Sequence, residues 1–273
     1  MPSTFDIDPD RVAAILRAAA ETEILPRFRA MESHEISEKN PGDLVTVADR
    51  AAEVFLTEHL QALIPGALIV GEEAHEDSPQ ALGQLADADW AWIIDPLDGT
   101  HNFAHGTPRF AVIVALARRG ETAMGWIYDP NGGHLATVEK GGGGAIDGAP
   151  LRLDAACPVA EMTGSLGHKF ADRLRARAGA PGAAAPPKAF LRYRCVGLEY
   201  MDLARGVLDF ARYAGKLMPW DHAAGVLLHA EAGGHAAMTG DERGYAPGAG
   251  RPGDALLLAP DGEAWRALND LMS

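Results

Sequence analysis

Acidic residues stand at four places where an apolar stretch of this sequence ends. They are Asp49, Glu72, the pair Asp95 and Asp98, and Asp221. Carboxylates that border hydrophobic elements are costly to bury unless a positive charge neutralises them. Because the chain holds only 24 Lys and Arg against 38 Asp and Glu, a divalent metal ion is the candidate that best supplies this charge.

The segment Asp95-Pro96-Leu97-Asp98-Gly99-Thr100 has the residue types of a magnesium-binding turn. Mg²⁺ prefers oxygen ligands, and the fixed φ of Pro96 would orient the Leu97 carbonyl between the two carboxylates. Gly99 leaves room for a ligand to approach the backbone. The two aspartates are also common turn formers, so only their combination with the other acids indicates a metal site.

Four blocks of the sequence resemble the signature blocks of the inositol monophosphatase superfamily, whose members are Mg²⁺-dependent, lithium-sensitive phosphomonoesterases. The blocks are Asp43–Asp49, Gly71–Glu73, Trp92–Phe103 and Trp220–Gly225, in the family order. The resemblance implies a mixed α/β (α+β) fold, a layered αβαβα sandwich of the inositol monophosphatase and fructose-1,6-bisphosphatase type. It also implies metals between two lobes and a homodimer.

The resemblance further implies two or three Mg²⁺ ions in each site. Glu72, Asp95 and the Leu97 carbonyl would hold the first ion. Asp95, Asp98 and Asp221 would hold the second, and a weaker third ion would depend on Glu72 through waters.

The expected catalytic residues are Glu72, Thr100 and Asp49. By resemblance, Thr100 and Asp49 form the proton relay that orients the attacking water, and the amides of Gly99 and Thr100 bind the phosphate. Asp49 on its own is equally consistent with a solvated helix face.

Two positions depart from the inositol-preferring pattern. Where those members have a Gly-Ser/Thr-Ala-Ala stretch, this sequence has Arg194-Cys195-Val196-Gly197. Where they have an acidic residue that binds sugar hydroxyls, it has Ala214, near Lys216. Arg194 and Lys216 could recognise a second anionic group, as in a bisphosphate or nucleotide, or they could both be solvated. The expected substrate-binding residues are Gly99, Thr100, Arg194, Lys216 and Asp221.

Hydrophobic periodicity and turn residues predict the elements that must position these groups. Helices are expected over 9–31, 46–63, 196–206 and 220–232, and strands over 67–71, 90–94, 110–117, 122–128, 134–139, 207–213 and 255–259. Residues 32–42 are expected to form a loop, and Lys39 and Asp43 match the mobile loop of the family. The Ala-, Gly- and Pro-rich segment 175–188 is expected to be a loop or a lobe boundary.

We expect an N-terminal α+β lobe over 1–150 that carries most metal ligands. A C-terminal α/β lobe over 151–273 would carry Asp221 and the substrate pocket.

Composition excludes several classes of protein. With 47% hydrophobic and 23% charged residues the chain has the material for a sizeable core. A net charge of −14 argues against nucleic acid or anionic lipid as a partner. Only Cys157 and Cys195 are present, so no disulfide framework or four-cysteine zinc site can form. With an acidic N-terminus and no apolar run of ~20 residues, a cytoplasmic protein without a membrane partner is expected.

The predicted function is hydrolysis of a small polyol or metabolite phosphate by water at a magnesium site. Inositol monophosphate is the first candidate substrate because it is the most frequent one in the family that the sequence resembles. Histidinol phosphate, fructose 1,6-bisphosphate and 3′-phosphoadenosine 5′-phosphate are the alternatives. A non-catalytic regulatory or binding protein on the same scaffold is the alternative from another class. The intact set of acids favours the enzyme.

Overall fold

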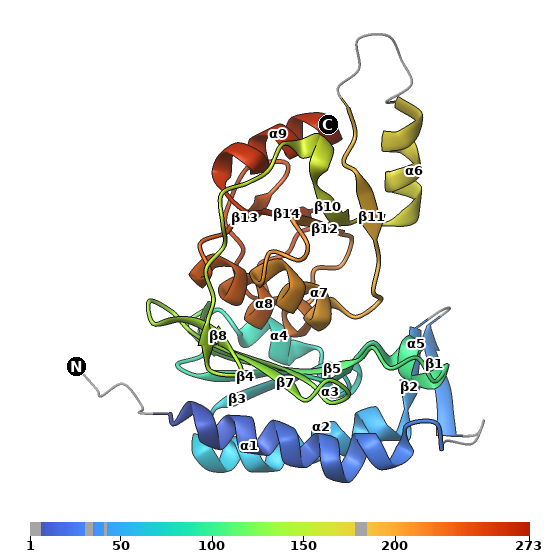
Figure 1. Ribbon diagram of the computed structural model, residues 1–273. Helices are drawn as coiled ribbons and strands as arrows, with labels where there is room; N and C mark the ends of the chain where they lie inside the picture. Colours follow the sequence, from blue (N-terminus) through green and yellow to red (C-terminus); the bar gives the residue numbers. More distant parts are fainter. Residues whose placement is uncertain (1–6, 31–34, 41–42, 178–184) are drawn as a thin grey trace.

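Five layers of secondary structure stack on one another in the computed structural model, which describes residues 7–30, 35–40, 43–177 and 185–273 (Figure 1). A pair of helices covers one face of a seven-stranded sheet, and two further helices separate that sheet from a five-stranded sheet. The outer face of the second sheet is covered by two more helices. The αβαβα order confirms the mixed α/β fold class.

The first helical layer consists of α1 (Pro9–Ala19) and α2 (Val47–Leu63). The predicted first helix leaves the α-helical geometry after Ala19, continues through a π-helical turn (Ala20–Ile24) and ends in a 3₁₀ turn (Leu25–Arg27). Pro26 lies in that last turn, and proline cannot continue a helix because it lacks the amide hydrogen.

The segment expected to be a loop over 32–42 contains a strand. An antiparallel hairpin joins β1 (Ile36–Asn40) to β2 (Asp43–Thr46), which leads directly into α2. The side chains of Lys39 and Asp43, expected over the site, lie outside the described part of the structure.

The seven-stranded sheet has the order β3-β4-β5-β6-β7-β8-β9, and only its β3–β4 pair is parallel. Its strands are β3 (Leu68–Gly71), β4 (Ala91–Asp98), β5 (Ala111–Arg118), β6 (Glu121–Asp129), β7 (His134–Glu139), β8 (Gly143–Ile146) and β9 (Ala149–Pro150). The strands predicted over 110–117, 122–128 and 134–139 are therefore confirmed, and they form an antiparallel meander.

The sequence predicted a strand over 90–94, but strand β4 does not end there in the structure. It continues through Pro96 to Asp98, and its pairing with β5 shifts register between Asp95 and Asp98. Such a bulge accommodates proline, which cannot donate a ladder hydrogen bond.

The remaining elements form the upper layers. The five-stranded sheet has the order β11-β10-β12-β14-β13. Its strands are β10 (Thr163–Ser165), β11 (Ala189–Leu191), β12 (Phe210–Ala214), β13 (His235–Met238) and β14 (Ala255–Ala259). The helices are α3 (Ala74–Asp77), α4 (Gln80–Gln84), α5 (Thr100–Ala104), α6 (His168–Arg177), α7 (Val196–Ala204), α8 (Pro219–Glu231) and α9 (Gly262–Met272), with a 3₁₀ turn at Val159–Glu161.

One hydrophobic core crosses the middle of the molecule. It joins residues of the seven-stranded sheet, such as Ile113, to Tyr200 of α7, Ala224 of α8 and Leu256 of β14. The division into lobes at residue 150 coincides with the end of the first sheet, but this shared core links the two sides, so the division stays a prediction. In the described residues, no helix combines the length and the apolar character that crossing a membrane requires.

Candidate functional site

Asp49 and Thr100 meet although they are 51 positions apart. Asp49 is 2% exposed, so it does not lie on a solvated helix face. Its carboxylate accepts from the amide of Thr46 at 2.9 Å, completing a capping box at the start of α2. Thr100 Oγ1 lies 2.8 Å from the other oxygen, Oδ1 of Asp49, and 3.0 Å from the Leu97 carbonyl. Burial raises the pKa of Asp49, and the bonds from Thr46 and Thr100 oppose that rise.

Asp95 lies among other carboxylates in the bulge of β4. Its side chain is 1% exposed and accepts from the Leu97 amide at 3.0 Å. Burial raises its pKa well above the ordinary value, and the charges of Glu72, Asp98, Asp221 and Asp49 raise it further, in that order. The predicted acids therefore lie within electrostatic reach of one another, as carboxylates that share a site do.

Asp98 connects the bulge to the middle helical layer. Its Oδ2 accepts from the Gly197 amide at 2.6 Å and from Cys195 Sγ at 3.1 Å. Gly197 is in the first turn of α7, where a negative charge is favourable. Burial raises the pKa of Asp98, and these bonds partly offset the rise. A Cβ at Gly197 would lie 3.0 Å from Ile127, so glycine allows this close approach.

Two helix–strand junctions place the other acids. Glu72 follows β3, and its amide donates to Ile94 at 3.1 Å, whereas Asp221 lies in the first turn of α8. Both side chains are half-buried. Helix α8 begins at Pro219 with Met218 as its N-cap, so Asp221 is not the cap.

As the side chains stand, no three His, Cys, Asp or Glu residues in the described part of the chain are gathered in a metal-site arrangement. The donor chemistry nevertheless fits magnesium, because every predicted ligand supplies an oxygen. The mutual repulsion at Asp95 would be relieved by a cation. The ligand assignments remain predictions.

Gly99 holds the turn between the acids and α5. Its φ is +89°, and a Cβ there would lie 2.8 Å from the Arg109 carbonyl oxygen. A side chain is therefore excluded twice, by backbone conformation and by space.

A cavity of about 270 Å³ opens beside Asp221 and Cys195. The other polar or charged residues that line it are Ser165, Arg192, Arg194, Glu199, Arg212, Tyr213, Lys216 and His222. Arg194 and Lys216, predicted as substrate-binding, therefore face the same cavity as the metal-ligand candidate Asp221. Their role stays a prediction.

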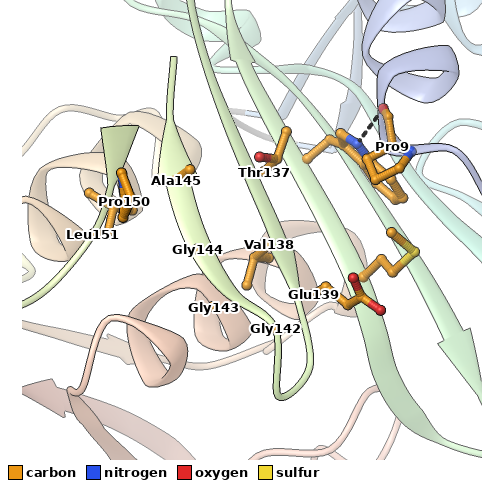
Figure 2. Close-up of a pocket in the computed structure, with 12 residues that line it drawn as sticks. Pro9, Thr137, Val138, Glu139, Gly142, Gly143, Gly144, Ala145, Pro150 and Leu151 are labelled. Carbon is orange, nitrogen blue, oxygen red and sulfur yellow. Dashed lines mark hydrogen bonds between the residues drawn. The ribbon is translucent and has the colours of Figure 1, made fainter. Parts of the chain in front are cut away.

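A larger cavity of about 340 Å³ lies elsewhere, between the β7–β8 hairpin and the start of α1 (Figure 2). Its lining includes Thr137, Val138 and three glycines, and Glu139 is the only charged residue in it. Without converging polar groups it offers no chemistry, although it is the larger of the two.

The sequence profile of the inositol monophosphatase family matches residues 8–259 of this chain. The chain belongs to the inositol monophosphatase family. Members of this family are phosphomonoesterases, so the protein is a phosphoric monoester hydrolase.

Named relatives and one solved structure agree with this family. An inositol-1-monophosphatase of Rhizobium meliloti is 34% identical over 216 residues, 76% of each chain. The Nus factor SuhB of Escherichia coli is 33% identical over 77% of this chain and 78% of its own. The inositol monophosphatase structure from Thermotoga maritima superimposes with a TM-score of 0.80 at 22% identity, covering 96% and 95% of the two chains.

Three residues near the candidate site were missed in the sequence analysis. Glu53 is 6% exposed and accepts from the amides of Glu73 and Ala74 at 2.8 and 2.7 Å, which fixes the turn after β3. Arg192 and Arg212 line the basic cavity. Glu53 could have been found as a charge on the apolar face of α2, whereas nothing in the sequence distinguished the two arginines.

Proposed function

We propose that this protein is a Mg²⁺-dependent phosphomonoesterase that hydrolyses a small metabolite phosphate by direct attack of water. Inositol monophosphate is the reference substrate because of the Rhizobium relative's name. The proposal includes two or three Mg²⁺ ions per site and inhibition by lithium.

The observation that carries the proposal is the Thr100–Asp49 hydrogen bond of 2.8 Å beside the buried acid cluster around Asp95. A hydroxyl that donates to a buried carboxylate has lone pairs left to accept a proton. A helix cap alone would not require Thr100.

In the proposed reaction Thr100 and Asp49 move one proton. As water attacks phosphorus and the ester P–O bond breaks, the water proton passes to Thr100 Oγ1 while the Thr100 proton passes to Asp49 Oδ1. The leaving alkoxide takes a proton from solvent water and departs as the alcohol. The raised pKa of buried Asp49 suits it to receive that proton.

Mg²⁺, when held by Glu72, Asp95, the Leu97 carbonyl, Asp98 and Asp221, would neutralise phosphate charge and acidify water at the site. The amides of Gly99 and Thr100 are proposed to bind the phosphate oxygens. In the structure, Gly99 and Thr100 follow directly after β4, whose bulge lies between Asp95 and Asp98.

The test is phosphate release from inositol 1-phosphate by chelator-treated protein, with and without added Mg²⁺ or Li⁺. We expect release only with Mg²⁺, and a loss of about 100-fold or more in Asp98→Asn. An unchanged rate in that variant would remove Asp98 from the reaction. Failure to release phosphate from any monoester would refute the proposed substrate class.

A second candidate is a binding role, favoured by the Nus factor SuhB relative. Titration of this protein against RNA and against transcription proteins separates the two roles. Activity that is lost in Asp98→Asn while binding persists would show that both are present.

We also propose a cytoplasmic homodimer, which sedimentation and cell fractionation would test.

A further inference from the structure

Four basic residues line the cavity beside Asp221. They are Arg192, Arg194, Arg212 and Lys216. They come from separate stretches of the chain, since two precede α7, one is in β12 and one lies between β12 and α8. In a chain with a net charge of −14, this gathering of cations needs an explanation.

None of the four forms an ion pair with a carboxylate among the residues that the structure describes. Elsewhere arginines do pair, as Arg119 does with Asp89 at 2.8 Å and Arg205 with Asp202. Glu199 also lines the cavity, but its carboxylate is already satisfied, accepting from the Tyr193 amide at 2.9 Å and from Tyr213 Oη at 3.0 Å. Glu199 and Asp221 are the two carboxylates of the lining, so its four cations exceed its carboxylates by two.

Arg212 is held in place by an aromatic ring and has no counter-ion among the described residues. Its guanidinium lies 4.2 Å from the ring centroid of Phe170 in α6, a cation–π arrangement. Burial lowers its pKa and the Arg173 charge lowers it further, so an anion beside it would be favourable.

Arg194 is held by the backbone. Its φ is +54°, a conformation rare for residues with a side chain, and its carbonyl accepts from Asn102 Nδ2 at 3.2 Å. Its Nη1 also lies 2.8 Å from Nε2 of His101. Strained residues of this kind concentrate at ligand sites.

The cavity adjoins the reacting centre. Asp221 lines it directly, and Cys195, which also lines it, donates to Asp98. A substrate whose phosphate lies among these acids would extend its remaining part toward the four cations.

We propose that the substrate carries a second phosphate group, which Arg192, Arg194, Arg212 and Lys216 bind in this cavity. The inference rests on the proposed phosphatase function. Arginine forks match phosphate oxygens, whereas an uncharged polyol leaves these cations unpaired and an amine-bearing phosphate is repelled by them. The substrate class is thus a sugar bisphosphate or a nucleotide with two separate phosphates.

The test compares fructose 1,6-bisphosphate with fructose 1-phosphate, which differ only in the second phosphate. In saturating Mg²⁺ we expect kcat/KM to be at least ~10-fold higher for the bisphosphate. In Arg212→Met this ratio falls to within about threefold of one, mainly through KM. Arg119→Met, which removes a positive charge that is not part of the cavity lining, keeps the wild-type ratio.

Arg194→Gly is a second variant that is expected to fold, because glycine readily adopts the φ of residue 194. It too should lower the ratio. A wild-type ratio near one, or a ratio unchanged in both cavity variants, overturns the second-phosphate site while leaving the phosphatase intact.

If neither sugar is hydrolysed, inositol 1-phosphate hydrolysis still decides the phosphatase proposal, and calorimetric titration of the same two sugars decides the cavity separately. Tighter binding of the bisphosphate that is lost in Arg212→Met supports the site. Equal binding overturns it.

Discussion

Thr100 and Asp49 belong to one hydrogen-bonded unit that serves both the fold and the proposed chemistry. Asp49 caps α2 by accepting a hydrogen bond from the Thr46 amide, and it accepts another from Thr100 Oγ1. A change at Asp49 would therefore disturb stability and activity together, whereas a change at Thr100 separates them.

We expect Thr100→Ala to lower kcat by about 10²–10⁴-fold, the usual contribution of proton transfer by a positioned side chain. KM and Tm should change little because the α2 cap remains. Thr100→Ser, which keeps the hydroxyl, should retain most of the rate. Steady-state phosphate release and thermal unfolding measure both effects. A Thr100→Ala enzyme with wild-type kcat would contradict the relay.

Asp95 is predicted to destabilise the metal-free fold at neutral pH. Burial and the surrounding carboxylates raise its pKa above the ordinary 3.8. Between pH 3.8 and the raised pKa of Asp95 in the folded state, the folded chain binds a proton that the unfolded chain releases. The stability of the fold therefore falls as pH rises through this interval.

In chelator at pH 8, Asp95→Asn should therefore melt higher than the wild type. We expect a rise of about 2–4 °C, equivalent to ~1 kcal/mol for a chain of this size. The difference should shrink toward zero below about pH 3, where Asp95 is protonated in both states. Glu58→Gln, an exposed change on α2, should show no such trend. A lower Tm for Asp95→Asn at pH 8 would contradict the prediction.

Contact between α7 and α8 determines where Asp221 lies. Gly225 of α8 faces the Tyr200 ring of α7, and a Cβ there would come within 2.1 Å of ring atoms. Tyr200 is fully buried, and its hydroxyl lies 2.9 Å from Nδ1 of His222, so the ring cannot easily turn aside. The glycine of the Trp220–Gly225 block is thus required by helix packing.

Gly225→Ala should destabilise the protein by about 1–3 kcal/mol, the usual cost of overpacking. It should also lower kcat/KM, because Asp221 lies one helical turn away on α8. Gly83→Ala in α4 is the matched control, since its Cβ would meet nothing within 4 Å, and it should be neutral or stabilising. Denaturant unfolding measures both changes. Equal stability of the two variants would show that the helices can separate without cost.

The sequence predicted these elements unevenly, for physical reasons. The acids were found because a carboxylate beside an apolar run is unusual, and a few neighbouring residues in the sequence are enough to show it. The continuation of β4 past Asp95 was not predicted, because only pairing with β5 shows that Pro96 lies in a bulge. The pairing of β1 with β2 was not predicted either, because the mostly polar strand β1 lacks an alternating hydrophobic pattern.

The basic cavity was the least predictable feature of the candidate site. Arg194 and Lys216 were noticed only as departures from a family pattern. Arg192 and Arg212 come together with them only when β12 and the segment before α7 take their places beside α8. Short-range sequence patterns do not predict which distant residues meet in the fold.

At the scale of the whole molecule, the acid cluster lies between two layers that the hydrophobic core holds together. Glu72 and Asp95 extend from neighbouring strands of the seven-stranded sheet, whereas Asp221 extends from α8 in the middle layer. Their like charges oppose the approach of these layers. A cation shared by them would convert that repulsion into a link between the sheet and α8.

Magnesium should therefore stabilise the whole fold and not only activate it. A ligand that binds only the folded state contributes about 2.7 kcal/mol at 100 times its Kd, so Tm should rise by roughly 5–10 °C in saturating Mg²⁺. Asp95→Asn, which starts higher in chelator, should lose most of this gain, whereas Glu58→Gln should keep it. This crossover between the chelator and magnesium melting curves distinguishes a shared metal site from a general effect of salt on an acidic protein. Parallel curves for wild type and Asp95→Asn would refute the shared site, even if Mg²⁺ raised both.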